Sequence, residues 1–159
     1  MLIFAVRLIL EEDGKILFLR QTKKNGGRYS LIGGNVEDHE FARQALAREA
    51  EEEAGIFVDP KHLDLVHCLH RHKLKKNEIY LVLYFKARRF RGQPESLEPK
   101  KFKDVEWLPA NSLPGKVSES TRHVLLSIQR NEIYSEYPER KTVMEFWERV
   151  NSAAEEFFE

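Results

Sequence analysis

The sequence predicts a mixed α/β layer fold in which strands, a hairpin and helices follow one another within one domain. The chain has 159 residues with 42% hydrophobic content, enough for one core and short for two domains. Two apolar runs flank Asp13-Gly14, a dipeptide typical of tight hairpin turns. Further on, apolar residues recur at three- and four-residue spacing between residues 39 and 54, which indicates a helix. Strands interleaved with helices favour stacked layers of both kinds.

Each element is predicted from its local pattern. Branched and aromatic residues indicate strands, and helical spacing with a following glycine such as Gly55 indicates helices. The predicted strands are 3–10, 15–21, 31–37 (running into a glycine-rich turn), 57–73, 78–90 and 104–110. The predicted helices are 39–54, 121–131 and 139–159.

The last helix carries an apolar stripe that needs a partner. Val143, Phe146, Trp147 and Val150 stand at i, i+3, i+4 and i+7, with Ala154 near the same face. A stripe of this kind avoids water, so the segment should pack on its own domain or on a second copy in a homodimer. Phe157 and Phe158 add aromatic surface. The expected division is a domain over 1–137 and a helical extension over 138–159.

Composition narrows the function classes. Twenty-six basic residues balance 26 acidic ones, which argues against nucleic-acid and membrane partners. The single cysteine, Cys68, cannot form an internal disulfide and fits a reducing compartment. The apolar segment 1–10 contains Arg7, is too short to span a bilayer and lacks a cleavage site. A cytoplasmic protein is therefore expected.

The segment 33–56, GGNVEDHEFARQALAREAEEEAGI, concentrates carboxylates on one helix. Glu49, Glu52 and Glu53 stand at i, i+3 and i+4, so they share a face, and Arg48 lies four residues before Glu52. Hard cations such as Mg²⁺ prefer oxygen ligands of this kind, and Gly33 lets the main chain approach closely. A solvated acidic face is the alternative explanation.

The spacing of residues within this segment favours a metal site over a solvated acidic face. After Gly34, five residues precede Glu40 and seven more precede Arg48-Glu49, and the segment ends in Glu52-Glu53-Ala54-Gly55-Ile56. This arrangement resembles the signature of the Nudix hydrolase family (MutT-like). Ala50 departs from it, since a larger aliphatic residue is usual there.

The resemblance implies a fold, a reaction and a set of roles. The fold would be an α/β/α sandwich with a mixed sheet, to which this chain adds its C-terminal helix. The reaction would be Mg²⁺-dependent (or Mn²⁺-dependent) hydrolysis of a nucleoside diphosphate linked to another moiety. Glu49, Glu52, Glu53 and the Gly33 carbonyl would bind metal, and Glu40 and Arg48 would orient the helix that carries them. One of these glutamates, or a later carboxylate, would accept the proton of the attacking water.

Residues outside the signature are further candidates for phosphate, metal and nucleobase contacts. Arg20, Lys23, Lys24 or Arg28 could meet phosphate, although each is also an ordinary surface residue. Glu98 is a candidate further metal ligand or base. Trp107 could stack on a nucleobase or fill the core, with Tyr29 and Phe85 as other possible stacking residues. A zinc site at His67, His70 and His72 lacks a cysteine set.

The substrate depends on accessory motifs, and these are mostly absent. Neither the array of the NADH-pyrophosphatase branch nor the tyrosine of the diadenosine-polyphosphate branch is present, and no proline points to ADP-ribose. A nucleoside triphosphate, giving monophosphate and pyrophosphate, is therefore favoured. ADP-ribose or another nucleotide sugar is the alternative, as are a non-catalytic nucleotide-sensing module and a scaffold that uses its last helix.

Overall fold

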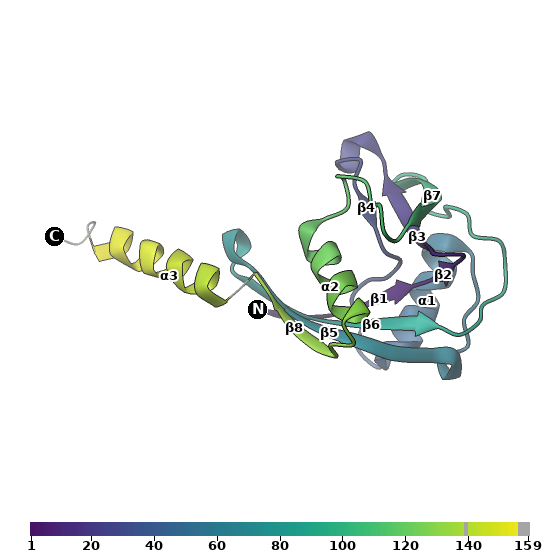
Figure 1. Cartoon of the computed structure of the whole chain (residues 1–159), viewed down its shortest axis with the longest axis horizontal. Helices are drawn as coiled ribbons and strands as arrows, with labels where there is room; N and C mark the ends of the chain where they lie inside the picture. The colour runs from purple at the N-terminus through teal and green to yellow at the C-terminus, as the bar shows by residue number, and fades with distance from the viewer. Residues whose placement is uncertain (139, 156–159) are drawn as a thin grey trace.

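The computed structural model describes residues 1–138 and 140–155. These residues form two four-stranded sheets and three α-helices (Figure 1). The first sheet, called sheet A, has the strand order β1-β6-β5-β8, and the second, called sheet B, consists of β2, β3, β4 and β7.

Sheet A is a mixed sheet. Its strands are β1 (Leu2–Ile9), β6 (Glu78–Ala87), β5 (Leu63–Lys73) and β8 (Tyr134–Tyr137). β1 runs parallel to β6, β5 antiparallel to β6, and β8 parallel to β5. The predicted mixed sheet is therefore confirmed.

Sheet B is antiparallel and begins with the predicted hairpin. Its strands are β2 (Glu11–Glu12), β3 (Lys15–Gln21), β4 (Tyr29–Ser30) and β7 (Phe102–Pro109). Between β2 and β3, Asp13 and Gly14 adopt φ values of 50° and 71°. Positive φ at both central residues is the requirement of a type I′ turn, which matches the twist of the two strands.

Two helices cover the faces of sheet A. α1 (Ala42–Ala54) contributes Ala45, Leu46 and Ala50 to a buried cluster with Val6 and Leu8 of β1. α2 (Glu119–Gln129) contributes Val124 to a second buried cluster, which includes Ala5 and Ile9 from the opposite face of β1. The predicted α/β/α arrangement is therefore confirmed.

The boundaries of α1 follow from its caps. The helix begins at Ala42, three residues later than predicted, because His39 has a left-handed φ of 70° and Phe41 is extended. The Gln44 side chain accepts a hydrogen bond from the Phe41 amide at 2.9 Å and satisfies this helix end. Gly55, at φ 65°, ends the helix as predicted.

The structure differs from the predicted strands most clearly at three places. Residues 31–37 form only single bridges to β1, through Ile32 and Asn35, because the chain turns at the glycines. The strand predicted from residue 57 begins at Leu63, since Pro60 starts a short 3₁₀ helix. β8 was not predicted, because four residues are too few for a clear alternating pattern.

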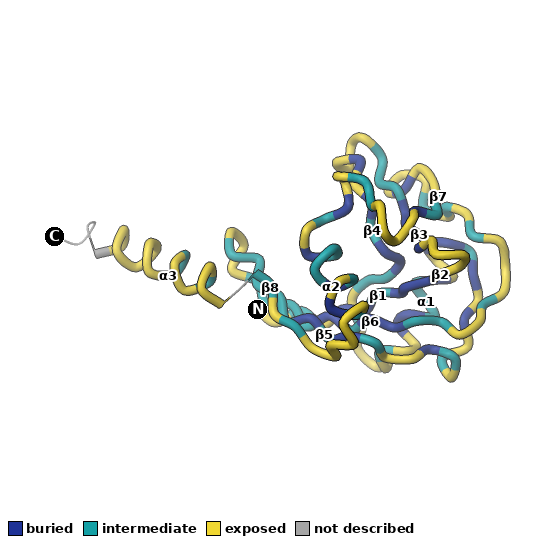
Figure 2. The backbone as a smooth tube through the Cα atoms, in the orientation of Figure 1, coloured by how far each residue is buried: buried dark blue, intermediate teal, exposed yellow. Residues whose placement is uncertain are grey.

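The C-terminal helix is α3 (Arg140–Glu155), and it projects from the end of β8 away from the sheets (Figure 1). Most of its surface is exposed (Figure 2), and Phe146 and Trp147 contact each other at a centroid distance of 5.3 Å. Packing of the stripe on the domain or on a second copy stays a prediction, and Phe157 and Phe158 lie outside the described residues. No helix within the described ranges has the length and apolar character needed to cross a membrane.

Candidate active site

The three glutamates of α1 form a series from the core to the solvent. Glu53 is 1% exposed, whereas the side chain of Glu49 is 14% exposed and that of Glu52 is 54% exposed. Their i, i+3, i+4 spacing puts them on neighbouring positions of the helix surface. The face they share lies at the border of the core, so each carboxylate meets a different environment.

Arg48 compensates the outer carboxylates. Its guanidinium donates to Glu40 at 2.8 and 3.1 Å, to Glu49 at 3.1 Å and to Glu52 at 3.1 Å, and it lies 3.8 Å from Glu37. The hydrogen bond to Glu40 and the charge of Glu49 raise the pKa of Arg48, while the same hydrogen bond lowers the pKa of Glu40. The arginine therefore joins the segment 37–40 to the helix. The orienting roles of Glu40 and Arg48 in catalysis stay a prediction.

Glu53 is compensated from inside the fold. Its carboxylate accepts a hydrogen bond from the Gly33 amide at 2.9 Å and one from Lys101 Nζ at 2.9 Å. Burial raises the pKa of Glu53, while the bonds from Gly33 and Lys101 oppose that rise. Lys101 also lies 3.4 Å from Glu98, so one lysine connects the glutamate of α1 with the candidate carboxylate of the later loop.

The sequence does not predict the contact between Lys101 and Glu53. The lysine lies 48 positions from Glu53 and belongs to a charged loop in which nothing distinguishes it from Lys100. Backbone hydrogen bonds fix this loop, since the amide of Leu97 donates to the carbonyl of Glu53 at 3.1 Å and the amide of Glu95 donates to Ala54. The contact is therefore produced by tertiary structure.

We expect Lys101→Met to destabilise the metal-free protein by about 1–2 kcal/mol at neutral pH. Removing one partner of a buried ion pair costs about 3–5 kcal/mol, and the half-exposed lysine reduces that figure through solvent screening. Chemical denaturation in the presence of chelator measures the loss. Lys100→Met, which changes an exposed lysine next to it, is the control and should be neutral within about 0.5 kcal/mol. Equal stability of the two variants would contradict the role given to Lys101.

A side chain at Gly33 would collide with the backbone of β1, and one at Gly34 would have to displace the Glu49 carboxylate. A Cβ atom at Gly33, whose φ is 144°, would lie 2.1 Å from the carbonyl oxygen of Val6. A Cβ atom at Gly34 would lie 2.1 Å from Glu49 Oε1. The two glycines therefore allow the main chain to approach both β1 and the carboxylate of α1. Arg7 adds a cation here, with Nη1 3.5 Å from the Gly34 carbonyl oxygen.

The oxygen atoms of this site suit a hard divalent cation. Glu49, Glu52 and Glu53 are carboxylates on one helix, and Glu98 reaches the same lysine as Glu53. In the described part of the chain, no three His, Cys, Asp or Glu side chains already converge as a metal site. Arg48 and Lys101 compensate the negative charge of these carboxylates through ion pairs. The donor set fits Mg²⁺ or Mn²⁺, and binding would require these ion pairs to rearrange.

The candidate phosphate-binding cations lie apart from one another. Arg20 is paired with Glu106 at 3.2 Å and stacks over Tyr29, whose hydroxyl donates to Glu106 at 2.8 Å. Lys23 and Lys24 are exposed in a short 3₁₀ helix (Lys23–Asn25). Arg28 lines a separate cavity. Of these cations, Arg20 therefore already has an anionic partner, whereas Arg28 is exposed to a cavity.

We expect the Arg20–Glu106–Tyr29 cluster to lose its stabilising effect in acid. Burial alone would raise the pKa of Glu106, but the hydrogen bonds from Tyr29 and Arg20 outweigh it and place the pKa below the ordinary 4.5. A lowered pKa stabilises the fold above pH 4.5, and the contribution disappears as the pH falls through the folded-state value. Glu106→Gln should therefore cost about 0.5–1 kcal/mol at pH 7 and progressively less below pH 4.5.

Denaturation curves of the wild type and of Glu106→Gln, recorded from pH 7 to pH 3, measure this difference. Glu12→Gln, an exposed position in the hairpin, is the control. A difference that stays constant over the whole range would contradict the assignment.

The aromatic and histidine candidates have mainly structural surroundings. Trp107 pairs with Leu17 across sheet B and packs, half-buried, against the core cluster of α1. Phe85 is 2% exposed under Arg43. His67 is fully buried, with its ring nitrogens 2.8 Å from the Glu132 carbonyl oxygen and 2.7 Å from Ser135 Oγ. The histidine thus attaches β8 to β5.

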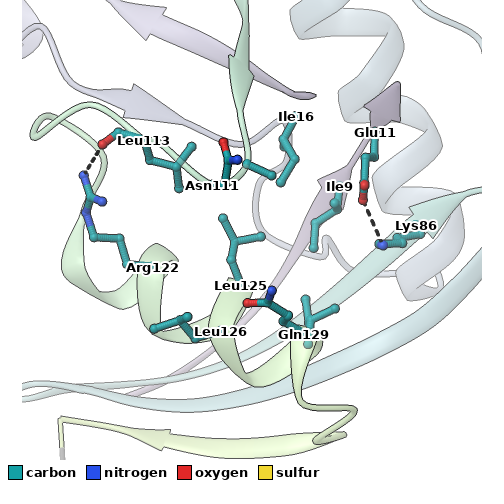
Figure 3. Close-up of a pocket in the computed structure, with 12 residues that line it drawn as sticks. Ile9, Glu11, Ile16, Lys86, Asn111, Leu113, Arg122, Leu125, Leu126 and Gln129 are labelled. Carbon is teal, nitrogen blue, oxygen red and sulfur yellow. Dashed lines mark hydrogen bonds and ion pairs between the residues drawn. The ribbon is translucent and has the colours of Figure 1, made fainter. Parts of the chain in front are cut away.

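A cavity of about 650 Å³ lies beside α2 (Figure 3). Its walls are mainly apolar, and its charged groups are already engaged: Lys86 with Glu11 at 3.0 Å, and Arg122 with the carbonyl oxygen of Leu113 at 3.1 Å. None of the candidate residues lines it. The position of the site therefore rests on the carboxylates and the glycine turn.

Comparisons with known proteins identify the family of the chain. The family model of the NUDIX domain matches residues 2–128. A MutT NUDIX hydrolase from Burkholderia pseudomallei has a similar structure, with a TM-score of 0.72 and 25% identity, over 79% of this chain and 97% of that one. The ORF135 protein of Escherichia coli gives a TM-score of 0.68 and 25% identity, over 81% of this chain and 89% of that one.

A curated relative matches a shorter region. CTP pyrophosphohydrolase of Escherichia coli (strain K12) is 44% identical over 57 residues, which are 35% of this chain and 42% of that protein. The aligned region thus spans less than half of the relative. The family match covers most of the chain and includes the glycine turn, α1, sheet B and all of sheet A except β8. The chain therefore belongs to the Nudix family.

Proposed function

We propose that the protein is a divalent-cation-dependent pyrophosphohydrolase acting on nucleotides, with a nucleoside triphosphate as its favoured substrate. The observation that carries this proposal is the series Glu49, Glu52 and Glu53 on one helix, with Glu49 directly against the backbone of Gly34 and Glu53 bonded to the amide of Gly33.

Metal binding is assigned to Glu49, Glu52, Glu53 and the Gly33 carbonyl, with Glu98 as a further ligand. The chemistry supplied by bound Mg²⁺ or Mn²⁺ is polarisation of the diphosphate and a lower pKa of the attacking water. Arg48 and Glu40 hold α1 against the preceding segment, so the carboxylates keep their relative positions.

The chain's own groups position the reacting atoms. Lys101 and the Gly33 amide fix the orientation of the Glu53 carboxylate inside the fold. One carboxylate of the set accepts a proton from water, whose oxygen bonds to a phosphorus atom while the bond to the bridging oxygen breaks. The bridging oxygen leaves with the pyrophosphate, and the nucleotide leaves as a monophosphate.

The choice of substrate rests on the absence of other branch motifs and on the names of the relatives. One relative is a CTP pyrophosphohydrolase, and the similar structures include MutT proteins. Substrate contacts are assigned to Arg28, Lys23, Arg20 and Trp107, of which Arg28 faces open space and Arg20 would first have to leave Glu106.

A panel of nucleoside triphosphates, ADP-ribose and nucleotide sugars, incubated with Mg²⁺ or Mn²⁺, tests the proposal. Chromatography of the products should reveal monophosphate and pyrophosphate from a triphosphate. Isotopically labelled water would identify the phosphorus that is attacked. Preferential cleavage of ADP-ribose would show that the favoured substrate is ADP-ribose and not a nucleoside triphosphate. Full activity in excess chelator would refute the metal dependence.

A further inference from the structure

A second polar cavity lies at the beginning of α2, where β4 and β8 approach the helix. It has a volume of about 460 Å³. Its wall includes the cationic side chains Arg28, Arg71 and Lys116 and one carboxylate, Glu119. Glu119 is 79% exposed on its side chain and lies 3.9 Å from Arg122, so it leaves the positive charge of the cavity largely uncompensated.

None of the three cations has an anionic partner within residues 1–138 and 140–155. Among the described residues, no ion pair and no side-chain hydrogen bond involves Arg28, Arg71 or Lys116. Arg71 Nε is buried and makes no hydrogen bond within the described chain. A buried guanidinium nitrogen without a partner is costly, so a bound anion would satisfy it.

The backbone holds these cations in place. Arg71 stands on β5 between Tyr80 of β6 and Tyr137 of β8, at paired positions of both neighbouring strands. The carbonyl of Lys116 accepts a hydrogen bond from the Tyr29 amide at 3.2 Å, which ties the start of α2 to β4. A Cβ atom at Gly27 would lie 3.4 Å from Lys116 Nζ, so the glycine leaves space for this ammonium group.

Two routes connect the cavity with the candidate active site. Arg28 precedes Gly33 by five residues, a span of at most about 18 Å in extended chain, comparable to the length of a nucleotide. On sheet A, Tyr84 is paired with Arg7, which reaches the Gly34 carbonyl. Arg71 is paired with Tyr80, which lies on the same face of β6 as Tyr84, so Arg7 and Arg71 share one face of sheet A. This face therefore carries cationic side chains both near the glycine turn and at the cavity.

We propose that Arg28, Arg71 and Lys116 bind a phosphate group carried by the nucleoside end of the substrate, away from the diphosphate that is cleaved. This inference rests on the proposed function and narrows its substrate class to nucleotides with an additional phosphate on the ribose. Arginine forks and an ammonium group match phosphate oxygens, whereas an uncharged base would need broad apolar walls. Free inorganic phosphate is the other source of the same chemistry.

Paired substrates test the proposal on the full chain with Mg²⁺. Adenosine 5′-triphosphate is compared with the same nucleotide carrying a 2′- or 3′-phosphate, and kcat and KM are measured for each. The phosphorylated nucleotide should be favoured at least tenfold in kcat/KM, mainly through KM. Arg71→Gln and the exposed-site variant Lys116→Gln should each bring that ratio close to one. Lys75→Gln, an exposed lysine outside the cavity, is the control.

The outcomes separate this inference from the proposed function. Equal kcat/KM for the two nucleotides in an active wild type would overturn the inference and leave the hydrolase assignment intact. If neither adenosine nucleotide is cleaved, the nucleotide panel described above tests the hydrolase assignment, and calorimetric titration with inorganic phosphate tests the cavity. Saturable phosphate binding that is lost in Arg71→Gln would support a phosphate pocket, and its absence from the wild type would refute one.

Discussion

Replacing Glu52 by glutamine is expected to reduce metal-dependent hydrolysis about a thousandfold. Glutamine keeps the shape of the side chain but removes the negative charge that a hard cation requires. The loss of several kcal/mol of charge stabilisation corresponds to a factor of about 10³ in rate. Steady-state kinetics at saturating Mg²⁺ would measure kcat and kcat/KM for the preferred nucleotide.

Glu52 suits this experiment because its side chain is 54% exposed, so the substitution should hardly affect folding. Glu51→Gln changes an exposed glutamate on the same helix and is the matched control, expected to retain activity within about twofold. Thermal denaturation of both variants checks that they are folded. An active Glu52→Gln variant would refute the metal assignment at this position.

Gly33→Ala is expected to destabilise the protein by at least about 3 kcal/mol. The strain of a side chain at an unfavourable positive φ costs about 1–3 kcal/mol, and here the new Cβ atom would also lie 2.1 Å from the Val6 carbonyl oxygen. For a chain of this length, such a loss corresponds to a decrease in Tm of roughly 10 °C. The Gly33 amide would move away from Glu53, so hydrolysis should fall as well.

Two other glycines serve as controls that separate backbone strain from the steric clash of the added Cβ atom. Gly14 has φ 71° but no atom within 4 Å of a built Cβ, so Gly14→Ala measures backbone strain alone, about 1 kcal/mol. Gly115 has neither a positive φ nor a close neighbour, so Gly115→Ala should be almost neutral. A Gly33→Ala variant that melts together with Gly115→Ala would contradict the close approach of the turn to β1.

The features that the sequence predicts correctly are local in the chain. The spacing of Glu49, Glu52 and Glu53 follows from helix geometry, and Gly55 ends α1 because only a few residues adopt its left-handed φ readily. The hairpin at Asp13-Gly14 depends on two adjacent φ values. Such features need no knowledge of the tertiary fold.

The features that the sequence does not predict are contacts between distant segments. Lys101 reaches Glu53 only because the loop 95–98 hydrogen-bonds to the end of α1. The inward orientation of Glu53 likewise depends on how α1 lies against the glycine turn. The cluster of Arg28, Arg71 and Lys116 brings together three segments that have no common motif.

The attachment of β8 through His67 also protects sheet A from unwanted pairing with other chains. An open strand edge offers unpaired amides and carbonyls to any extended peptide and promotes aggregation. β8 occupies β5 at Cys68–Arg71, and its own outer edge is only four residues long, with Glu136 exposed on it. A cut before Tyr134 would expose the middle of β5, an eleven-residue strand, as a template. β8 therefore limits strand pairing between protein molecules at this edge of sheet A, and this effect is independent of hydrolysis.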